Sequence, residues 1–426
     1  MADNPSLYTR IALPIPDNDW NNEEVYKYHI DNGYDWRNIN IIDHSTTATG
    51  CIKVLNDFVN GNGFKDKKLY GLVINKDGET ADKFRSDIGN AINNQERLTI
   101  HIQPNALGQI TSIKLIPSYL IRKMKIQKEG VNKKLMSNML VKSKYWYYGY
   151  FFSLKEDLEY YYPFTLDPKE IAEQIKHAGG IEKYNGQIID LNYCDNFNIY
   201  PKVTYHSALN YMLTEGEISL FYNNAVNNNF NASGILKTSV FETETEGGRE
   251  LKKRFDKNIN SHQSATNALK ILHVELQEGQ MFDYVPTQPV NVDNQYKNTD
   301  IVSFNKITAA FDVEEKLLKE TTGNGFDNKI KKSLYQSQNE KTKGKRLFAE
   351  QVMKLVFDNW HEGSPSNDYT IDQLKFELAL EDIPTELIKL ICDPSIDKNA
   401  LLGTLIEIGG YSEERAKNIL GLNKKT

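Results

Sequence analysis

The chain has 426 residues and a formal net charge of −6 at neutral pH. That length can form a sizeable core divided among two or three modules. With 39% hydrophobic and 25% charged residues, a soluble globular protein is expected. No apolar run is long enough to span a bilayer. Pro5, Asp17, Asp19, Glu23 and Glu24 interrupt the apolar core that a signal peptide needs, so a cytoplasmic start is expected.

Charge and cysteine usage argue against two kinds of site. A sequence-specific DNA-binding protein usually carries a basic patch and a high pI, whereas this chain is acidic on average. Cys51, Cys194 and Cys392 are far apart and lack the paired spacing of a metal site. Because a free cysteine behaves as a small hydrophobe, we expect buried free thiols.

The N-terminal part begins with a polar arm over residues 1–40. Aromatic residues such as Tyr8 and Trp20 interrupt this arm. They indicate that the arm lies on another surface, either its own domain, which is the simpler interpretation, or a neighbouring subunit. A helix is predicted over 45–60, and Gly61 provides its C-terminal stop.

A β-rich region follows the first helix. Residues 98–103 and 109–116 flank a turn and predict a hairpin. Aromatic runs over 144–152 and 159–164 predict further strands. Aromatic rings can stack on nucleic-acid bases, but strand propensity favours packing in a sheet or at a subunit interface. A short helix over 168–177 completes an α+β module.

Two long amphipathic helices dominate the middle of the chain. The first is predicted over 207–228 and the second over 293–311, where Asp293 can cap the first turn. The apolar stripe of the first helix contains Leu209, Met212, Leu213, Gly216 and Leu220. The stripe of the second contains Ile301, Phe304, Ile307, Thr308 and Phe311. Two such helices predict a stalk with a module at its tip.

The residues between the helices predict a compact β-α-β insert. Its parts are a strand over 233–240, a charged helix over 249–258 and a strand over 269–276. So small a piece has a poor core and open sheet edges. We therefore expect its strands to pair with a neighbouring subunit. The predicted interface residues are Ile235, Leu236, Val240, Leu272, Val274 and Leu276.

Composition changes after the second long helix. Residues 314–344 are polar, show no apolar period and predict a long loop or a frayed helix. A helix is predicted over 345–360, followed by a linker at 363–367. Thr370 and Gln373 form a possible capping box that would open a small C-terminal helical module.

The sequence shows little that indicates chemistry. It contains no phosphate-binding loop, nucleophile elbow, His-Glu-x-x-His motif or Cys-x-x-Cys pair. The eight histidines are scattered without metal spacing. No catalytic, cofactor or metal residue is therefore predicted. An enzyme that processes DNA or a polysaccharide through a dispersed acid–base pair remains the alternative.

Several segments resemble portal proteins of tailed double-stranded DNA bacteriophages. They occur in the order of that family and cover roughly residues 40 to 360 with their flanks. The segments are YP at 200–201, SALN at 207–210, EISLF at 217–221, NNNFNASGIL at 227–236, LKKRF at 251–255 and ITAAFDV at 307–313. The resemblance rests on the order of apolar and small residues, without a catalytic signature.

That resemblance implies an α+β fold with portal-like architecture. The parts would be an N-terminal arm (1–40), a wing (41–204), a first stem helix (205–230), a clip (231–288), a second stem helix (289–313), a tunnel loop region (314–344), a wing helix with linker (345–366) and a helical crown (367–426). The resemblance also implies a non-enzymatic homo-oligomeric ring, with twelve copies expected, at one capsid vertex. The ring would form in the host cytoplasm during assembly and become part of the virion, without cofactor or membrane.

The implied partners and site residues follow from the same resemblance. DNA would pass non-specifically through the channel, driven by a separate terminase. The ring would nucleate assembly with the major capsid or scaffolding protein and hold a head–tail connector or adaptor. An acidic wall suits sliding DNA, because it does not bind phosphate tightly. Stem packing is predicted at Leu209, Leu213, Gly216, Leu220, Phe304 and Phe311.

A local reversal of charge marks the implied tunnel loop. Between residues 327 and 346 the chain is basic, although it is acidic overall. Repeated around a ring, these side chains would form a cationic collar that contacts phosphates without reading bases. A solvated basic loop that touches nothing is the alternative. The predicted DNA-facing residues are Lys329, Lys331, Lys332, Lys341, Lys343, Lys345 and Arg346.

Overall fold

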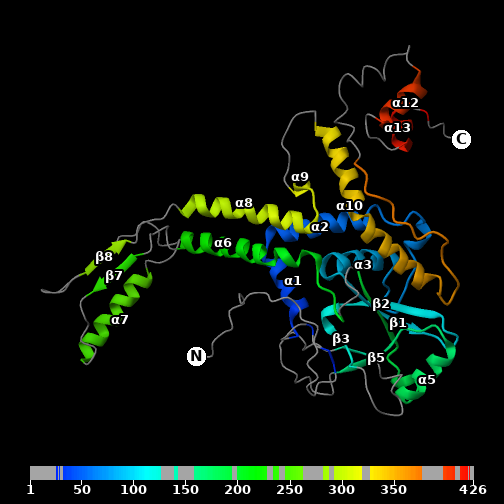
Figure 1. The fold of residues 1–426 in the computed structure, drawn as a ribbon, viewed down its shortest axis with the longest axis horizontal. Helices are drawn as coiled ribbons and strands as arrows, with labels where there is room; N and C mark the ends of the chain where they lie inside the picture. Colours follow the sequence, from blue (N-terminus) through cyan, green and yellow to red (C-terminus); the bar gives the residue numbers. More distant parts are fainter. Residues whose placement is uncertain are drawn as a thin grey trace. The chain divides into compact units, whose positions relative to one another are not determined.

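The computed structural model describes residues 25–26, 28, 32–125, 139–142, 158–193, 199–227, 234–238, 245–261, 282–286, 292–318, 327–376, 397–407, 413–420 and 422. The chain divides into two units (Figure 1). The first, here called the body unit, comprises Met1–Leu209 together with Ile307–Thr426. The second, the insert unit, comprises Asn210–Lys306 and interrupts the body unit in sequence. The fold is mixed α+β.

A six-stranded mixed sheet forms the centre of the body unit, in the order β2-β1-β6-β5-β4-β3. Neighbouring strands are antiparallel except β5 and β6, which are parallel. The strands are β1 (Arg97–Pro104), β2 (Ile110–Ile116), β3 (Ile121–Lys123), β4 (Leu140–Lys142), β5 (Glu159–Pro163) and β6 (Gln187–Asn192). The predicted hairpin is confirmed as β1 and β2, and the predicted strand 159–164 as β5. The aromatic run 144–152 lies outside the described residues.

The β1–β2 turn shows why this hairpin can be predicted from sequence. The Asn105 side chain accepts hydrogen bonds from the backbone amides of Leu107 (2.9 Å) and Gln109 (3.0 Å). Gly108 adopts φ 82°, a left-handed conformation that glycine accepts without steric cost. An asparagine that folds back on its own backbone and a glycine at positive φ are the usual chemistry of a tight turn.

Helices of the body unit begin and end at residues suited to those positions. The helices are α1 (Tyr34–His44), α2 (Thr46–Asn60), α3 (Ala81–Gln95), α5 (Pro168–Ala178), α9 (Glu315–Leu318), α10 (Asp327–Phe357), α12 (Lys398–Glu407) and α13 (Glu413–Ile419), with short 3-10 turns at η1 (Lys67–Leu69), η2 (Ser118–Leu120), η5 (Ile181–Lys183) and η6 (Thr204–Ala208). The Ser45 hydroxyl accepts from the Ala48 amide (3.1 Å) and caps α2, and Gly61 at φ 51° ends it. This confirms the helix predicted over 45–60, and α5 confirms the one predicted over 168–177.

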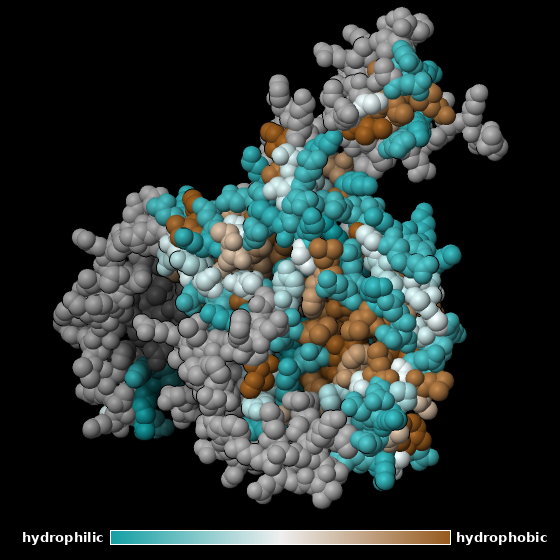
Figure 2. Space-filling view, turned by 45° about the vertical axis from the view of Figure 1, so that its right-hand side comes forward, coloured by the Kyte–Doolittle hydropathy of each residue, from teal (hydrophilic) through white to brown (hydrophobic). Residues whose placement is uncertain are grey.

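The main core lies between the sheet and the helices α3 and α10 (Figure 1). A helix face of α3, the second half of α10 and the inward residues of β1 contribute to it. The residues are Phe84, Ile88 and Ile92 from α3, Val352, Met353 and Val356 from α10, and Leu98, Ile100 and Ile102 from β1. Figure 2 also shows hydrophobic residues gathered at the surface of the body unit among hydrophilic ones. The core therefore joins elements from both halves of this discontinuous unit.

The arm boundary predicted at residue 40 is corrected by the structure, because residues 34–40 already belong to α1. Tyr28 is buried, and its ring stacks on that of Tyr200 with centroids 4.7 Å apart. The end of the arm therefore lies on its own body unit, which confirms the simpler interpretation for these residues. The remainder, 1–24, lies outside the described residues.

The helix start predicted at Thr370 is wrong. Ile371 instead forms an antiparallel bridge with Phe64. The Asp372 amide donates to the Gly63 carbonyl (2.8 Å), and residues 372–376 continue without helix. Ile371 belongs to the main core, so burial of its side chain overrides the local capping signal. Farther on, α12 and α13 form a small apolar cluster of their own, with Leu401, Leu405, Ala416 and Leu420 buried.

The insert unit contains the two predicted long helices (Figure 1). They are α6 (Leu209–Asn227) and α8 (Val292–Phe311), which confirm the helices predicted over 207–228 and 293–311. Between them lie β7 (Gly234–Thr238), α7 (Glu246–Ser261) and β8 (Phe282–Pro286), so the first strand and the charged helix are also confirmed. The strand predicted over 269–276 lies outside the described residues. The strand that pairs with β7 in antiparallel register, Leu236 opposite Tyr284, is β8.

Candidate functional site

The insert unit presents large apolar side chains to solvent on both of its long helices. On α6 these are Leu220, Phe221 and Tyr222, and on α8 they are Ile301 and Val302. Leu220 is 48% exposed and Ile301 is 57% exposed. Apolar residues surround the whole circumference of α6, a pattern that is typical of a helix buried on all sides. Contiguous exposed apolar surface of this kind marks an interaction site.

An aromatic contact joins the two helices. The rings of Phe221 on α6 and Tyr296 on α8 are stacked with centroids 4.4 Å apart. Tyr222 lies against the same tyrosine at 6.2 Å. Offset aromatic pairs contribute about 0.5–1.5 kcal/mol beyond the area they bury. This contact holds α6 and α8 side by side where Phe221 and Tyr222 remain partly open to solvent.

The structure only partly supports the single apolar stripe predicted for α6. Leu209 and Met212 are buried as expected, and Leu213 and Gly216 are half-buried. Leu220 continues the stripe but is exposed, whereas Ile218, on the opposite side of the helix, is buried. The buried side therefore changes along α6, because this helix has apolar residues on every side.

The predicted residues of the second helix show the same division. Phe311 is buried and stacks on Tyr205 within the body unit, with centroids 4.7 Å apart. Phe304 is half-buried. Ile301 belongs to the stripe but is exposed. Whether these residues pack between copies stays a prediction.

The predicted clip interface is only partly covered by the structure. Ile235 and Leu236 lie in β7, as predicted. Val240, Leu272, Val274 and Leu276 lie outside the described residues. Within the described part, β7 pairs with β8 of its own chain, and pairing with a neighbouring subunit stays a prediction.

The predicted tunnel loop is wrong for residues 327–344, because they form the first part of α10, a continuous helix of 31 residues. The boundary predicted at residue 344 falls inside this helix. All the predicted DNA-facing residues, Lys329, Lys331, Lys332, Lys341, Lys343, Lys345 and Arg346, are therefore helical. A mobile cationic loop does not exist at these positions.

Several of these cations hold α10 in the body unit. Lys341 pairs with Asp312 (3.1 Å) and Glu314 (2.9 Å). Lys345 donates to the Asn93 side chain (3.1 Å). Arg346 is buried and donates to the backbone oxygens of Phe58 (3.0 Å) and Asn339 (3.2 Å). Arg346 is thus a structural anchor rather than a DNA contact.

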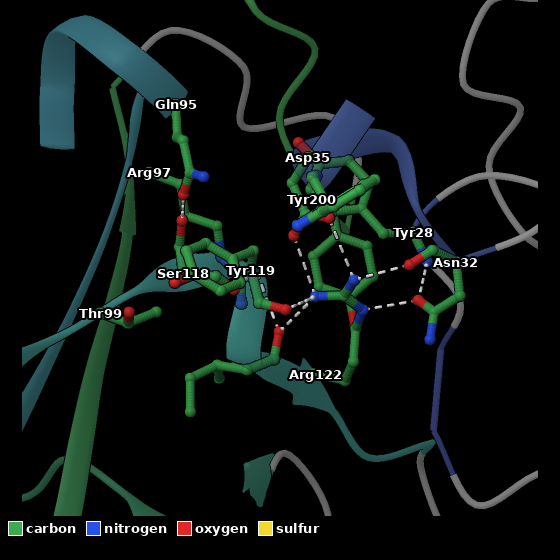
Figure 3. Close-up of polar contacts among 12 residues, drawn as sticks. Tyr28, Asn32, Asp35, Gln95, Arg97, Thr99, Ser118, Tyr119, Arg122 and Tyr200 are labelled. Atoms are coloured by element: carbon green, nitrogen blue, oxygen red, sulfur yellow. Dashed lines mark hydrogen bonds and ion pairs between the residues drawn. The ribbon is translucent and has the colours of Figure 1, made fainter. Parts of the chain in front are cut away.

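A buried polar cluster, which the sequence did not reveal, ties the arm to the sheet (Figure 3). The Arg122 guanidinium is fully buried and forms a two-pronged pair with Asp35 at 3.1 and 3.2 Å. It also donates to the Asn32 side chain (2.5 Å) and backbone oxygen (2.8 Å). Asn32 adopts φ 58°, a conformation that asparagine tolerates better than most residues. These bonds fix the chain just before α1.

A second buried arginine lies on the other side of the Tyr200 ring. Arg97 pairs with Asp190 at 2.8 and 3.1 Å, and Lys123 contacts the same carboxylate at 3.0 Å. The guanidinium carbon of Arg97 is 4.8 Å from the Tyr200 ring centre, and that of Arg122 is 5.8 Å away. Burial raises the pKa of Tyr200 to about 12, so this hydroxyl stays protonated and donates to the Tyr26 carbonyl (2.8 Å).

These buried ionic groups do not form an acid–base pair. Burial alone would raise the pKa of Asp190, but the charges and hydrogen bonds of Arg97 and Lys123 hold it below its usual range. Asp35 is likewise occupied by Arg122. Among the described residues, no group of histidine, cysteine, aspartate and glutamate is arranged to hold a metal ion. The cluster supports the fold.

Two further sequence expectations can be compared with the described residues. Cys51 is a buried free thiol, as predicted, and Cys194 and Cys392 lie outside the described residues. No helix in the described part of the chain is both long enough and apolar enough to cross a membrane.

Comparison with known proteins identified similar solved structures but no family. No protein-family model matches the chain, and no curated protein matches it. A chain in the virion of a native gene transfer agent particle matches with a TM-score of 0.43 and 12% identity over 91% of this chain and 94% of that chain. Chains in the neck of the empty particle, computed with C6 symmetry, and of the native particle, computed with C12 symmetry, give the same values. Likeness at this level establishes neither a shared activity nor shared partners.

Proposed function

We propose that this chain is the subunit of a portal-type ring that encloses double-stranded DNA at one vertex of a phage-like capsid. The observation that carries the proposal is the exposed apolar surface on α6 and α8 of the insert unit. The sequence segments that resemble portal proteins lie on these same helices and on β7 and α7. A two-helix unit with a small strand–helix–strand insert is the arrangement that the resemblance implies.

The position of the exposed residues favours a ring of identical copies. They lie on both long helices, so a single copy leaves apolar surface uncovered on more than one element. In a cyclic assembly each subunit contacts its two neighbours through two different faces. A second and a third copy therefore cover both faces at once. Twelve copies are expected from the sequence resemblance.

The role toward DNA is passive in this proposal. A net charge of −6 per subunit is multiplied around the ring, and an acidic wall repels phosphates instead of holding them. The DNA would be moved by a separate terminase. The same ring would contact the major capsid or scaffolding protein and a head–tail adaptor, and it would reside in the virion. It would need no cofactor and perform no chemical step.

A DNA- or polysaccharide-processing enzyme is the second candidate. That chemistry needs a carboxylate with a raised pKa beside an ionised partner in an accessible cleft. The buried carboxylates Asp35 and Asp190 are each paired with an arginine instead. No contact in the described residues favours this candidate over the ring.

A topological experiment tests whether the assembly encloses DNA. Subunits are assembled with a nicked circular DNA or with its linear form, and the salt concentration is raised to about 1 M, where direct charge contacts are screened within roughly 3 Å. Rings should stay on the circle and slide off the linear form, because only free ends allow an enclosing ring to escape. Cutting the loaded circle should release them. Equal loss from both forms would show surface binding and contradict the proposal.

A further inference from the structure

A groove lies between α6 and α8 of the insert unit. Its volume is about 270 Å³, and its surface is mainly apolar. It is lined by Tyr211 and Thr214 of α6 and by Asn298, Thr299, Val302 and Ser303 of α8. All of these residues belong to the insert unit, so the groove is formed by this unit alone.

The contents of the groove indicate that something fills it. Ser303 is buried, and its hydroxyl has no hydrogen-bond partner in the structure. A buried hydroxyl without a partner costs about 1–3 kcal/mol. Small-molecule pockets usually measure about 300–1,000 Å³ and enclose most of their ligand. A volume below that range, open to the surface, suits a protein side chain better than a cofactor.

Ile301 has the chemistry and the position to be that side chain. It is the most exposed large apolar residue of the described insert unit, at 57%. On α8 it lies within one turn, about 5.4 Å, of each groove residue of that helix. At 3.6 residues per turn it lies about 130° round the helix from the middle of those residues. It therefore faces away from the groove of its own chain.

We propose that Ile301 of one copy inserts into the groove between α6 and α8 of the next copy. The inference rests on the proposed ring. Rotation about a ring axis keeps equivalent atoms at the same height, so a protruding residue and a groove at the same level of a stem helix along that axis meet in adjacent copies. Removing Ile301 from water stabilises each contact through the hydrophobic effect. The contact also fixes how far each stem is rotated relative to its neighbour.

Disulfide cross-linking tests the contact directly. The variant Ile301→Cys with Thr214→Cys is oxidised under mild conditions and analysed on a denaturing gel without reductant. A ladder of covalent oligomers is expected, because each copy would be linked to the next. The wild-type chain measures the background from Cys51, Cys194 and Cys392. Each single variant and the pair Val73→Cys with Thr214→Cys are matched controls, since Val73 is 54% exposed but lies in the body unit.

Electron microscopy of the same samples separates the two ideas. Rings without a ladder would overturn the Ile301 contact and leave the ring intact, and absence of rings in the wild type would overturn both. A second variant pair provides an independent measurement. Ile301→Lys should raise the subunit concentration needed for half-assembly about tenfold or more, whereas Ile301→Leu should change it less than threefold. Equal assembly of both variants would also contradict the contact.

Discussion

Asp190 is a buried carboxylate whose charge is balanced by Arg97 and Lys123. Its pKa in the folded chain lies below the value of about 3.9 expected for the unfolded chain. The sign follows from proton binding: the unfolded state binds a proton first as the pH falls. This carboxylate therefore stabilises the fold fully above about pH 4, and its contribution is lost as the pH drops through the folded pKa.

Replacing Asp190 with asparagine is predicted to destabilise the body unit. The variant leaves the Arg97 charge without its carboxylate partner in a buried site, which costs about 3–5 kcal/mol. Urea denaturation at neutral pH measures the loss. The acid-dependent part of the unfolding free energy that belongs to this carboxylate should also disappear. Asp77→Asn is the control, because the Asp77–Lys114 pair is exposed and worth about 0–1 kcal/mol. Wild-type stability of the Asp190 variant would contradict the assignment.

Among the elements, α10 is the one for which sequence and structure differ most. Its first half has a buried side made largely of polar residues, including Gln338, Asn339 and Thr342. Gln338 accepts from the Glu314 amide (3.0 Å), and Asn339 donates to the Leu374 carbonyl (2.8 Å). A helix whose buried face is polar shows no apolar period, so the pattern predicted a loop. Its run of lysine, glutamine and glutamate, which favour helices, was the available signal.

The correction for α10 gives a prediction that separates anchoring from DNA contact. Arg346→Gln should lower the free energy of unfolding by about 1–3 kcal/mol, because the backbone acceptors of Phe58 and Asn339 lose their buried donor. Lys343→Gln, on the exposed side of the same helix, should change stability by about 0–0.5 kcal/mol. Thermal and urea denaturation of both variants provide the comparison. Equal stability of the two would mean that Arg346 is no anchor.

Other elements were predictable for physical reasons that the structure makes visible. The helices α2 and α5 and the β1–β2 hairpin carry their own caps, glycine stops and turn residues, so local sequence decides them. The long helices α6 and α8 follow from sustained apolar spacing. The cluster around Tyr200 joins residues from Tyr28 to Tyr200 through tertiary contacts. No periodicity encodes such contacts, so the buried arginines, like the groove beside Ser303, emerge only from the structure.

At the scale of the whole molecule, the account depends on the exposed apolar surface of the insert unit. Its residues belong to the two segments that sequence and structure agree on most closely, α6 and α8. Leu220→Glu places a charge in that surface without disturbing a buried side chain, since Leu220 is half exposed in the single chain. Burying that charge at an interface would be costly, so this variant should stay folded and fail to assemble.

Negative-stain electron microscopy of the purified full chain tests the central claim most directly. The wild type and the control Val73→Glu, which alters an equally exposed residue of the body unit, are imaged beside Leu220→Glu. Circular dichroism confirms that all three chains are folded. The account predicts closed rings with a central hole for the wild type and the control, and single subunits for Leu220→Glu. A wild-type chain that stays monomeric or dimeric at every concentration, with no central hole, would contradict it.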